Sequence, residues 1–148
     1  MTPPGGMENR LLVALPSADL DLLMPELEVV ALHQDTALSH AGDQIDHVYF
    51  PHSGAISLMI HMANGKAVAT AAIGREGGVG LLSVLGPSPS AITAVVHAPG
   101  TASRIPASRF HAAFTRSAAI RQIVQTIFGN LFFTITNLLY LVNKPTIN

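Results

Sequence analysis

Cysteine and tryptophan are absent from this chain of 148 residues, and only 11% of its residues are charged. The lack of cysteine excludes thiol catalysis, zinc sites built on Cys ligands, iron–sulfur clusters and disulfides. Charge is also balanced, because 8 Lys and Arg stand against 9 Asp and Glu. Proteins that bind nucleic acid through its phosphates carry a basic excess, so we do not expect this chain to contact DNA directly.

Hydrophobic residues make up 49% of the sequence, which at this length predicts one folded domain with a substantial core. Residues 1–9 are rich in Pro and Gly, and we expect a disordered tail there. The tail lacks the basic stretch and apolar run of a secretory signal, so a cytoplasmic location is expected.

One apolar segment, residues 123–142, carries no charge and is long enough to span a bilayer. It contains Gln125, Asn130 and Asn137, lacks Trp and has one basic residue at each flank. These features favour a buried or dimer-forming helix over a membrane span, and no membrane partner is expected.

Short apolar or β-branched runs separated by turn residues predict a mainly β domain with helices. Asn64-Gly65 is a hairpin signal, because both residues tolerate positive φ. Seven or eight such strands indicate a sandwich, barrel or jelly roll. The runs occupy residues 27–31, 36–40, 48–50, 55–62, 66–73, 92–97 and 101–105.

Helical patterns flank the predicted strands. Ser17 is placed to cap a short helix that Pro25 ends. After Pro106, residues 107–114 predict another short helix, and Ser117 caps a longer one. We therefore expect a β-roll with flanking helices over residues 10–116, a long helix over 117–142 and a tail over 143–148.

Apolar positions in the long helix alternate in steps of four and three, the spacing of a two-helix seam. A second stripe, which begins at Phe128, adjoins this seam and could cover the roll. Two stripes favour a homodimer over a helix buried only on its own domain. The predicted dimer seam consists of Ile120, Val124, Ile127, Leu131, Thr134, Leu138 and Leu141.

The segment from His40 to Gly54 resembles the early signature of cyclic-nucleotide-binding domains, in which Gly and an acidic residue precede an apolar-aromatic strand and a second Gly. The resemblance continues through the hairpin, a loop at 74–85 and Arg104-Ile105-Pro106, and covers about Asn9 to Val142. Within this superfamily the chain is most similar to Crp/Fnr-type transcription regulators that carry Gly-Arg-Glu-Gly, here residues 74–77, before the loop.

This resemblance implies a double-stranded β-helix, or jelly roll, of cyclic-nucleotide-binding type, with a short N-terminal helix and a long C-terminal dimerisation helix. The loop would hold a small ligand, because glycines let backbone N–H groups approach an anion closely. The ligand-binding residues that it implies are Gly78, Val79, Gly80, Leu81, Leu82, Ser90 and Ala91.

Two side chains that hold a cyclic nucleotide in this family are missing here. The family follows the loop glycine, here Gly80, with a Glu for the ribose, but this chain has Leu81. The Arg for the cyclic phosphate would fall near Ser90 or Ala91, and the nearest downstream arginine is Arg104. Since each hydrogen bond to a charged group contributes about 1.5–3 kcal/mol, we expect no tight binding of cAMP or cGMP and assign no cofactor.

The resemblance further predicts a sensor domain of a transcription regulator that relays ligand binding through a dimer helix. Relatives continue into a helix-turn-helix domain, for which the residues after Val142 leave no room, so DNA contact is expected from another chain. The alternative is a ligand-free structural or protein-interaction module, which the loss of Glu and Arg favours.

An enzyme is not expected from the sequence. Histidines are scattered without a His-x-His or a His-x-x-x-His pair, so no metal site is predicted. A Gly-x-Ser-x-Gly nucleophile motif is also absent. The histidines are His33, His40, His47, His52, His61, His97 and His111.

Overall fold

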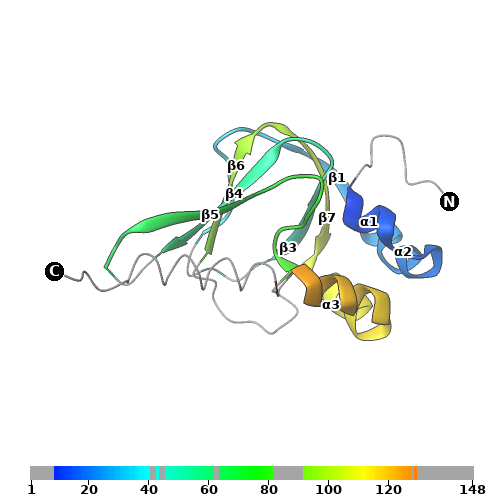
Figure 1. The fold of residues 1–148 in the computed structure, drawn as a ribbon. Helices are drawn as coiled ribbons and strands as arrows, with labels where there is room; N and C mark the ends of the chain where they lie inside the picture. The colour runs from blue at the N-terminus through cyan, green and yellow to red at the C-terminus, as the bar shows by residue number, and fades with distance from the viewer. Residues whose placement is uncertain are drawn as a thin grey trace.

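The computed structural model describes residues 9–40, 43, 46–61, 64–81, 92–127 and 129. This part of the chain forms three α-helices and seven strands, and Figure 1 shows the helices lying beside the strands. The helices are α1 (Arg10–Ala14), α2 (Ser17–Leu23), which continues into the 3-10 turn Met24–Glu26, and α3 (Ala107–Arg116). The strands are β1 (Glu28–Leu32), β2 (Ala37–Ser39), β3 (His47–Pro51), β4 (Ala55–His61), β5 (Ala67–Ile73), β6 (Ile92–Ala98) and β7 (Gly100–Pro106).

These strands form two sheets whose neighbours are all antiparallel. The smaller sheet has the order β1-β7-β3 and the larger sheet the order β2-β6-β4-β5. Successive strands often change sheet, since β1 is followed by β2 and β3 by β4 in the other sheet. This exchange is typical of a jelly roll, and the predicted mainly β fold is confirmed.

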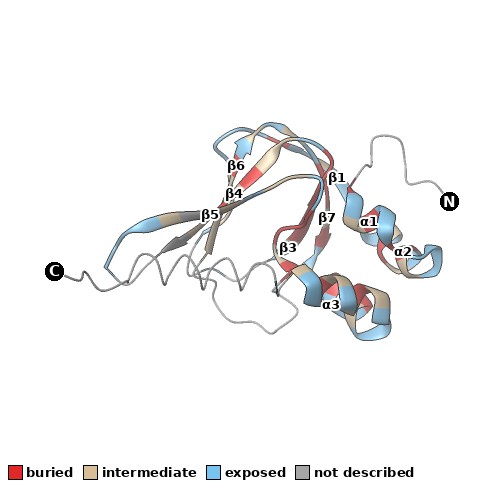
Figure 2. Ribbon diagram, in the orientation of Figure 1, coloured by how far each residue is buried: buried red, intermediate tan, exposed pale blue. Residues whose placement is uncertain are grey.

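Two hydrophobic cores lie on opposite faces of the smaller sheet. The helix-side core lies between this sheet and the helices, and the roll core lies between the two sheets. Side chains of a strand alternate between its faces, so β3 serves both cores: Val48 and Phe50 belong to the helix-side core and Tyr49 to the roll core. Figure 2 shows β3 buried along its length between these layers.

The strands appear where the sequence predicts them, within one or two residues at each end. Two predictions about the N-terminal helices were wrong. Helix α1 was not predicted, and its N-cap Asn9, placed in the disordered tail, is fully buried. Pro16, and not Ser17, occupies the N-cap of α2, where no side chain caps the helix.

Glycines shape the turns at both ends of the roll. Gly65 has φ +84° at the predicted hairpin between β4 and β5, and the Asn64 side chain accepts a hydrogen bond from Lys66 N at 3.0 Å. At the opposite corner Gly100 packs against Ser53, where a Cβ atom would lie 2.3 Å from the Ser53 carbonyl oxygen. Backbone contact of this kind cannot be relieved by a rotamer change.

We predict that Gly100→Ala destabilises the domain more than Gly65→Ala. The hairpin change adds only the strain of positive φ, about 1–2 kcal/mol, since nothing lies within 4 Å of a Cβ at this position. The corner change forces two backbone segments apart and should cost at least about 3 kcal/mol. Urea unfolding followed by circular dichroism measures both, and equal losses would contradict the steric argument.

Candidate functional site

The candidate site is the glycine-rich loop that follows β5, of which the structure describes residues 74–81. It starts with a tight turn in which Gly77 N donates to Gly74 O at 3.1 Å and Gly74 N donates to the Glu76 carboxylate at 3.0 Å. Arg75 and Glu76 are both exposed. These two charged side chains therefore lie at the surface of the turn.

Beyond the turn, the loop runs antiparallel to β3. Val79 N donates to Tyr49 O and Tyr49 N donates to Val79 O, both at 2.8 Å. Gly78 packs closely against β3, because a Cβ atom added at this residue would lie 3.3 Å from the Phe50 ring. Gly80 has φ +90°, a conformation that only glycine adopts without strain. The loop thus forms a single antiparallel bridge with the free edge of β3, followed by a turn that requires glycine.

The side chains of the predicted ligand residues in this loop are largely committed to packing. Val79 belongs to the roll core and Leu81 to the helix-side core, with 7% and 4% of their surfaces exposed. Their side chains are therefore held by contacts within the protein. Leu82, Ser90 and Ala91 lie outside the described residues.

Arg104 lies on the roll side of the smaller sheet, but it already has partners. It is paired with Glu28 of β1 and with Tyr49 of β3. Because directly opposite residues of neighbouring strands share a face of the sheet, Arg104 points to the same side as Tyr49. Its Nε lies 3.3 Å from the Glu28 carboxylate. The largest effect on the pKa of Arg104 is a hydrogen bond with Tyr49, which raises it. Glu28 raises the pKa as well, whereas burial lowers it. Glu28 already neutralises this guanidinium.

The helix that follows α3 begins at Ser117, as predicted. The Ser117 hydroxyl accepts from Ile120 N at 3.1 Å, caps residues 118–127, and donates to the Asp19 carboxylate of α2 at 2.5 Å. Ile120 and Val124 are buried in the helix-side core with Leu81.

Ile120 and Val124, which the sequence assigns to the dimer seam, are buried within this chain. At its first turns the helix faces its own domain, because the other elements of this chain cover both side chains. Ile127 is partly buried against the same core. The remaining seam residues and the whole second stripe lie outside the described residues; these seam residues are Leu131, Thr134, Leu138 and Leu141.

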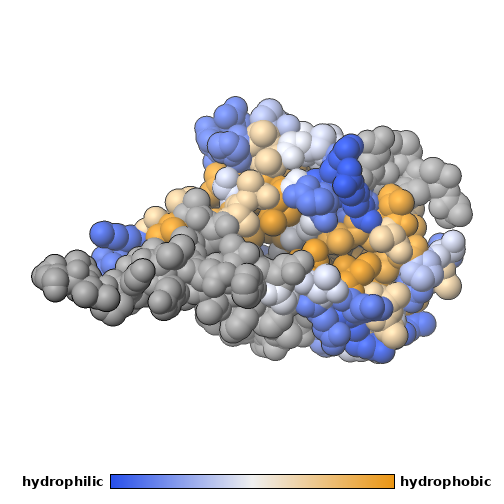
Figure 3. All heavy atoms as spheres, viewed as in Figure 1, coloured by the Kyte–Doolittle hydropathy of each residue, from blue (hydrophilic) through white to orange (hydrophobic). Residues whose placement is uncertain are grey.

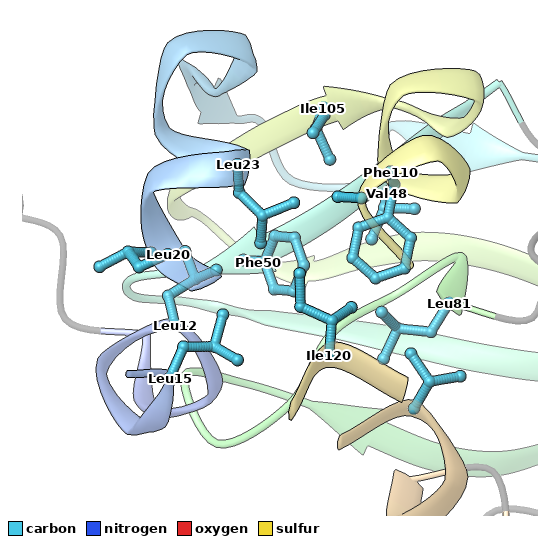
Figure 4. Packing of buried hydrophobic residues seen from close by; sticks show 12 residues of the cluster. Leu12, Leu15, Leu20, Leu23, Val48, Phe50, Leu81, Ile105, Phe110 and Ile120 are labelled. Atoms are coloured by element: carbon cyan, nitrogen blue, oxygen red, sulfur yellow. The ribbon is translucent and has the colours of Figure 1, made fainter. Parts of the chain in front are cut away.

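Loop and helices meet around a small apolar cavity of about 10 Å³. Figure 4 shows Leu81 facing Ile120 and Phe110, with α1 and α2 contributing leucines from the other side. In Figure 3 the hydrophobic residues on the visible face gather between these helices. A space of this size holds about one water molecule, so it is a packing defect and not a ligand pocket. Its lining residues are Leu11, Leu12, Leu15, Leu23, Phe50, Leu81, Phe110, Ile120 and Ile123.

Histidines do not converge in the described part of the chain, where no group of His, Asp or Glu could hold a metal. His52 is buried, and its ring nitrogens lie 3.2 Å from the Thr101 hydroxyl and 2.7 Å from the Ser103 hydroxyl. This contact joins the residue that follows β3 to β7 inside the fold. Within the described ranges, no helix is both long and apolar enough to cross a membrane.

Asn9 is the polar residue at the site that the sequence reading missed. Its side-chain oxygen accepts from Leu11 N and Leu12 N, while its amide nitrogen donates to Pro51 O at 2.9 Å and to Gly77 O at 2.8 Å. The only local signal was an N-cap residue type before a short apolar run. Its contacts with β3 and the loop are tertiary and have no signature in the sequence.

The family model of the cyclic nucleotide-binding domain matches residues 29–117 of this chain. No curated protein matches the chain.

Solved structures share this fold at low sequence identity. The regulatory subunit of a cAMP-independent protein kinase A from Trypanosoma brucei has a TM-score of 0.74 at 13% identity, covering 89% of this chain and 48% of that one. The c-di-GMP responsive regulator CLP of Xanthomonas campestris has a TM-score of 0.71 at 12% identity, with coverage of 88% and 66%. The catabolite activator protein of Thermus thermophilus has a TM-score of 0.72 at 17% identity, with coverage of 89% and 62%. The chain thus spans between about half and two thirds of their lengths.

We predict that Leu81 and Ile120 are energetically coupled, because they share one cavity. Leu81→Ala should cost about 2–5 kcal/mol, and its combination with Ile120→Val should depart from additivity by about 0.5 kcal/mol or more. The matched control pairs Leu81→Ala with Leu58→Ala, which lies in the roll core. Urea unfolding of the two double-mutant cycles should show coupling only in the first, and additivity in both would contradict the shared packing.

Proposed function

The chain belongs to the family of cyclic nucleotide-binding domains, and from this premise we propose that it is the sensor domain of a Crp-type transcription regulator. It binds a small ligand at residues 78–82, Ser90 and Ala91 and relays the binding to the helix that follows Ser117. The similarity to the Xanthomonas campestris and Thermus thermophilus regulators supports the regulatory role.

The observation that carries this proposal is the place of Leu81. This residue ends the described part of the loop, and its side chain packs in the same core as Ile120 and Val124. A ligand that moved the loop would withdraw or reposition Leu81, and the start of the helix would lose part of its packing. An apolar contact therefore transmits ligand binding to the helix.

The ligand that this chemistry favours is not cAMP bound in the usual family manner. Leu81 replaces the Glu that would accept from a ribose hydroxyl, and Arg104 is neutralised by Glu28. The backbone around Gly78 and Gly80 remains suited to an anionic group. The second candidate, a ligand-free interaction module, is favoured by the same missing side chains.

We predict that cAMP binds with a dissociation constant above 1 µM. That affinity corresponds to about 8 kcal/mol, and two missing charge-assisted contacts remove about 3 kcal/mol or more. Amide NMR shifts measured during titration with cAMP, cGMP and cyclic di-GMP test this, with the amides of Val79 and of residues 118–127 as reporters. Sub-micromolar cAMP binding would overturn the expectation.

The same titration separates the two candidate functions. A sensor gives saturable shifts with at least one probe, at the loop and at the helix together. If no probe shifts the loop amides at millimolar concentration, the sensor proposal fails and the interaction module replaces it.

For the homodimer, the proposal places the seam from Ile127 onward. We predict that Ile127→Asp makes the protein monomeric, because two carboxylates would be buried without partners. Gln125→Asp, on an exposed position of the same helix, is the control and should stay dimeric. Light scattering measures the mass and circular dichroism shows that each variant is folded; a folded, dimeric Ile127→Asp protein would contradict the seam.

A further inference from the structure

Hydrogen bonding between β3 and the loop stops at a residue that cannot continue it. In an antiparallel pair, the residues that exchange two hydrogen bonds recur at every second position. Tyr49 and Val79 form such a pair, so the next one would join Pro51 to Gly77. Proline has no N–H to donate to Gly77 O, and Gly77 N donates instead to Gly74 O. Two carbonyls, Pro51 O and Gly77 O, are thus left without the strand partners that they would have.

Asn9 supplies the missing donors. Its side-chain Nδ2 carries two hydrogens and donates to Gly77 O at 2.8 Å and to Pro51 O at 2.9 Å. Asn9 is fully buried, so water does not compete for these bonds. One amide group therefore bridges β3 and the loop at the point where proline interrupts their pairing.

The same side chain fixes the N-terminal helix. Asn9 Oδ1 accepts from Leu11 N at 3.0 Å and from Leu12 N at 3.3 Å, and thereby caps α1. Arg10 N also donates to Arg75 O of the loop at 2.7 Å. Helix α1 is therefore attached by its first residues to the loop, while Leu12 and Leu15 pack beside Phe50 in the helix-side core (Figure 4).

We propose that Asn9 is a positioning residue for the ligand loop: the loop keeps its place only while Asn9 donates to both carbonyls, and α1 is released when the loop moves. This inference deepens the proposed function, since it assumes that the loop at residues 74–81 takes part in ligand binding. The hydrogen bonds themselves can be tested without any ligand.

The test separates the donors of Asn9 from its role as a helix cap. Asn9→Ser keeps an oxygen that caps a helix about equally well, but its single hydroxyl hydrogen cannot serve two carbonyls. The reporter is the exchange of the Val79 amide hydrogen, which bonds to Tyr49 O beside the bridge. We expect this exchange to accelerate about fivefold or more relative to that of Val96, a fully buried residue of β6 whose amide bonds to Thr36 O.

The matched control is Asn64→Ala, which removes a side-chain hydrogen bond at the hairpin between β4 and β5, at the end of β5 opposite the loop. It should lower global stability without changing the exchange ratio of Val79 to Val96. A role in capping alone would make Asn9→Ser behave like the wild type, and a purely global loss would leave the ratio unchanged. Either result overturns the proposal.

A second variant allows the bridge to be tested even if Asn9→Ser folds poorly. Pro51→Ala restores a backbone N–H that can donate to Gly77 O, and it cannot compensate for a lost helix cap. In the Asn9→Ser background, Pro51→Ala should bring the exchange ratio back toward the wild-type value, or recover folding. If the double variant is no better than Asn9→Ser, the bridge between Pro51 and Gly77 is not what Asn9 provides.

Discussion

Strand β3 makes contacts on both faces and along both edges, and the rest of the structure depends on these contacts. Its side chains alternate between the helix-side core and the roll core, as Phe50 and Tyr49 illustrate. One edge pairs with β7 over its whole length, and the other edge receives the loop at Val79. A residue in β3 therefore cannot shift without disturbing helices, roll and loop together. Strand β3 is therefore held in place from several sides, whereas the described loop pairs with it only at Val79.

Much of the roll could be predicted because its signals are local. Runs of apolar and β-branched residues mark each strand, and Gly65 of the predicted hairpin has φ +84°, a conformation that glycine adopts without strain. The Ser117 cap is local too, since its hydroxyl serves the amide three residues on. Such features need no knowledge of what packs against them.

The errors arose where a choice depended on tertiary contacts. The spacing of Ile120 and Val124 predicts an apolar stripe correctly, but spacing alone does not say whether the partner is another chain or the same domain. Helix α1 has only five residues, too few for periodicity to show. It is stable because Asn9 and Leu12 are buried against distant segments. A ligand role for Val79 and Leu81 stays a prediction from the family pattern, which does not reveal that both side chains also pack in the two cores.

Displacement of the loop has a definite energetic scale. It must expose the Leu81 side chain, which costs about 1.5–3 kcal/mol, and break the hydrogen bonds at Val79 and Asn9, which cost about 1 kcal/mol each when water replaces them. A ligand shifts such an equilibrium only by its difference in affinity for the two loop positions. Micromolar binding, about 8 kcal/mol, exceeds this cost, provided that the ligand binds the displaced loop selectively. The cavity beside Leu81 and Ile120 lowers the cost further, since neighbouring apolar side chains have room to repack. A ligand of ordinary affinity is therefore sufficient to move this loop.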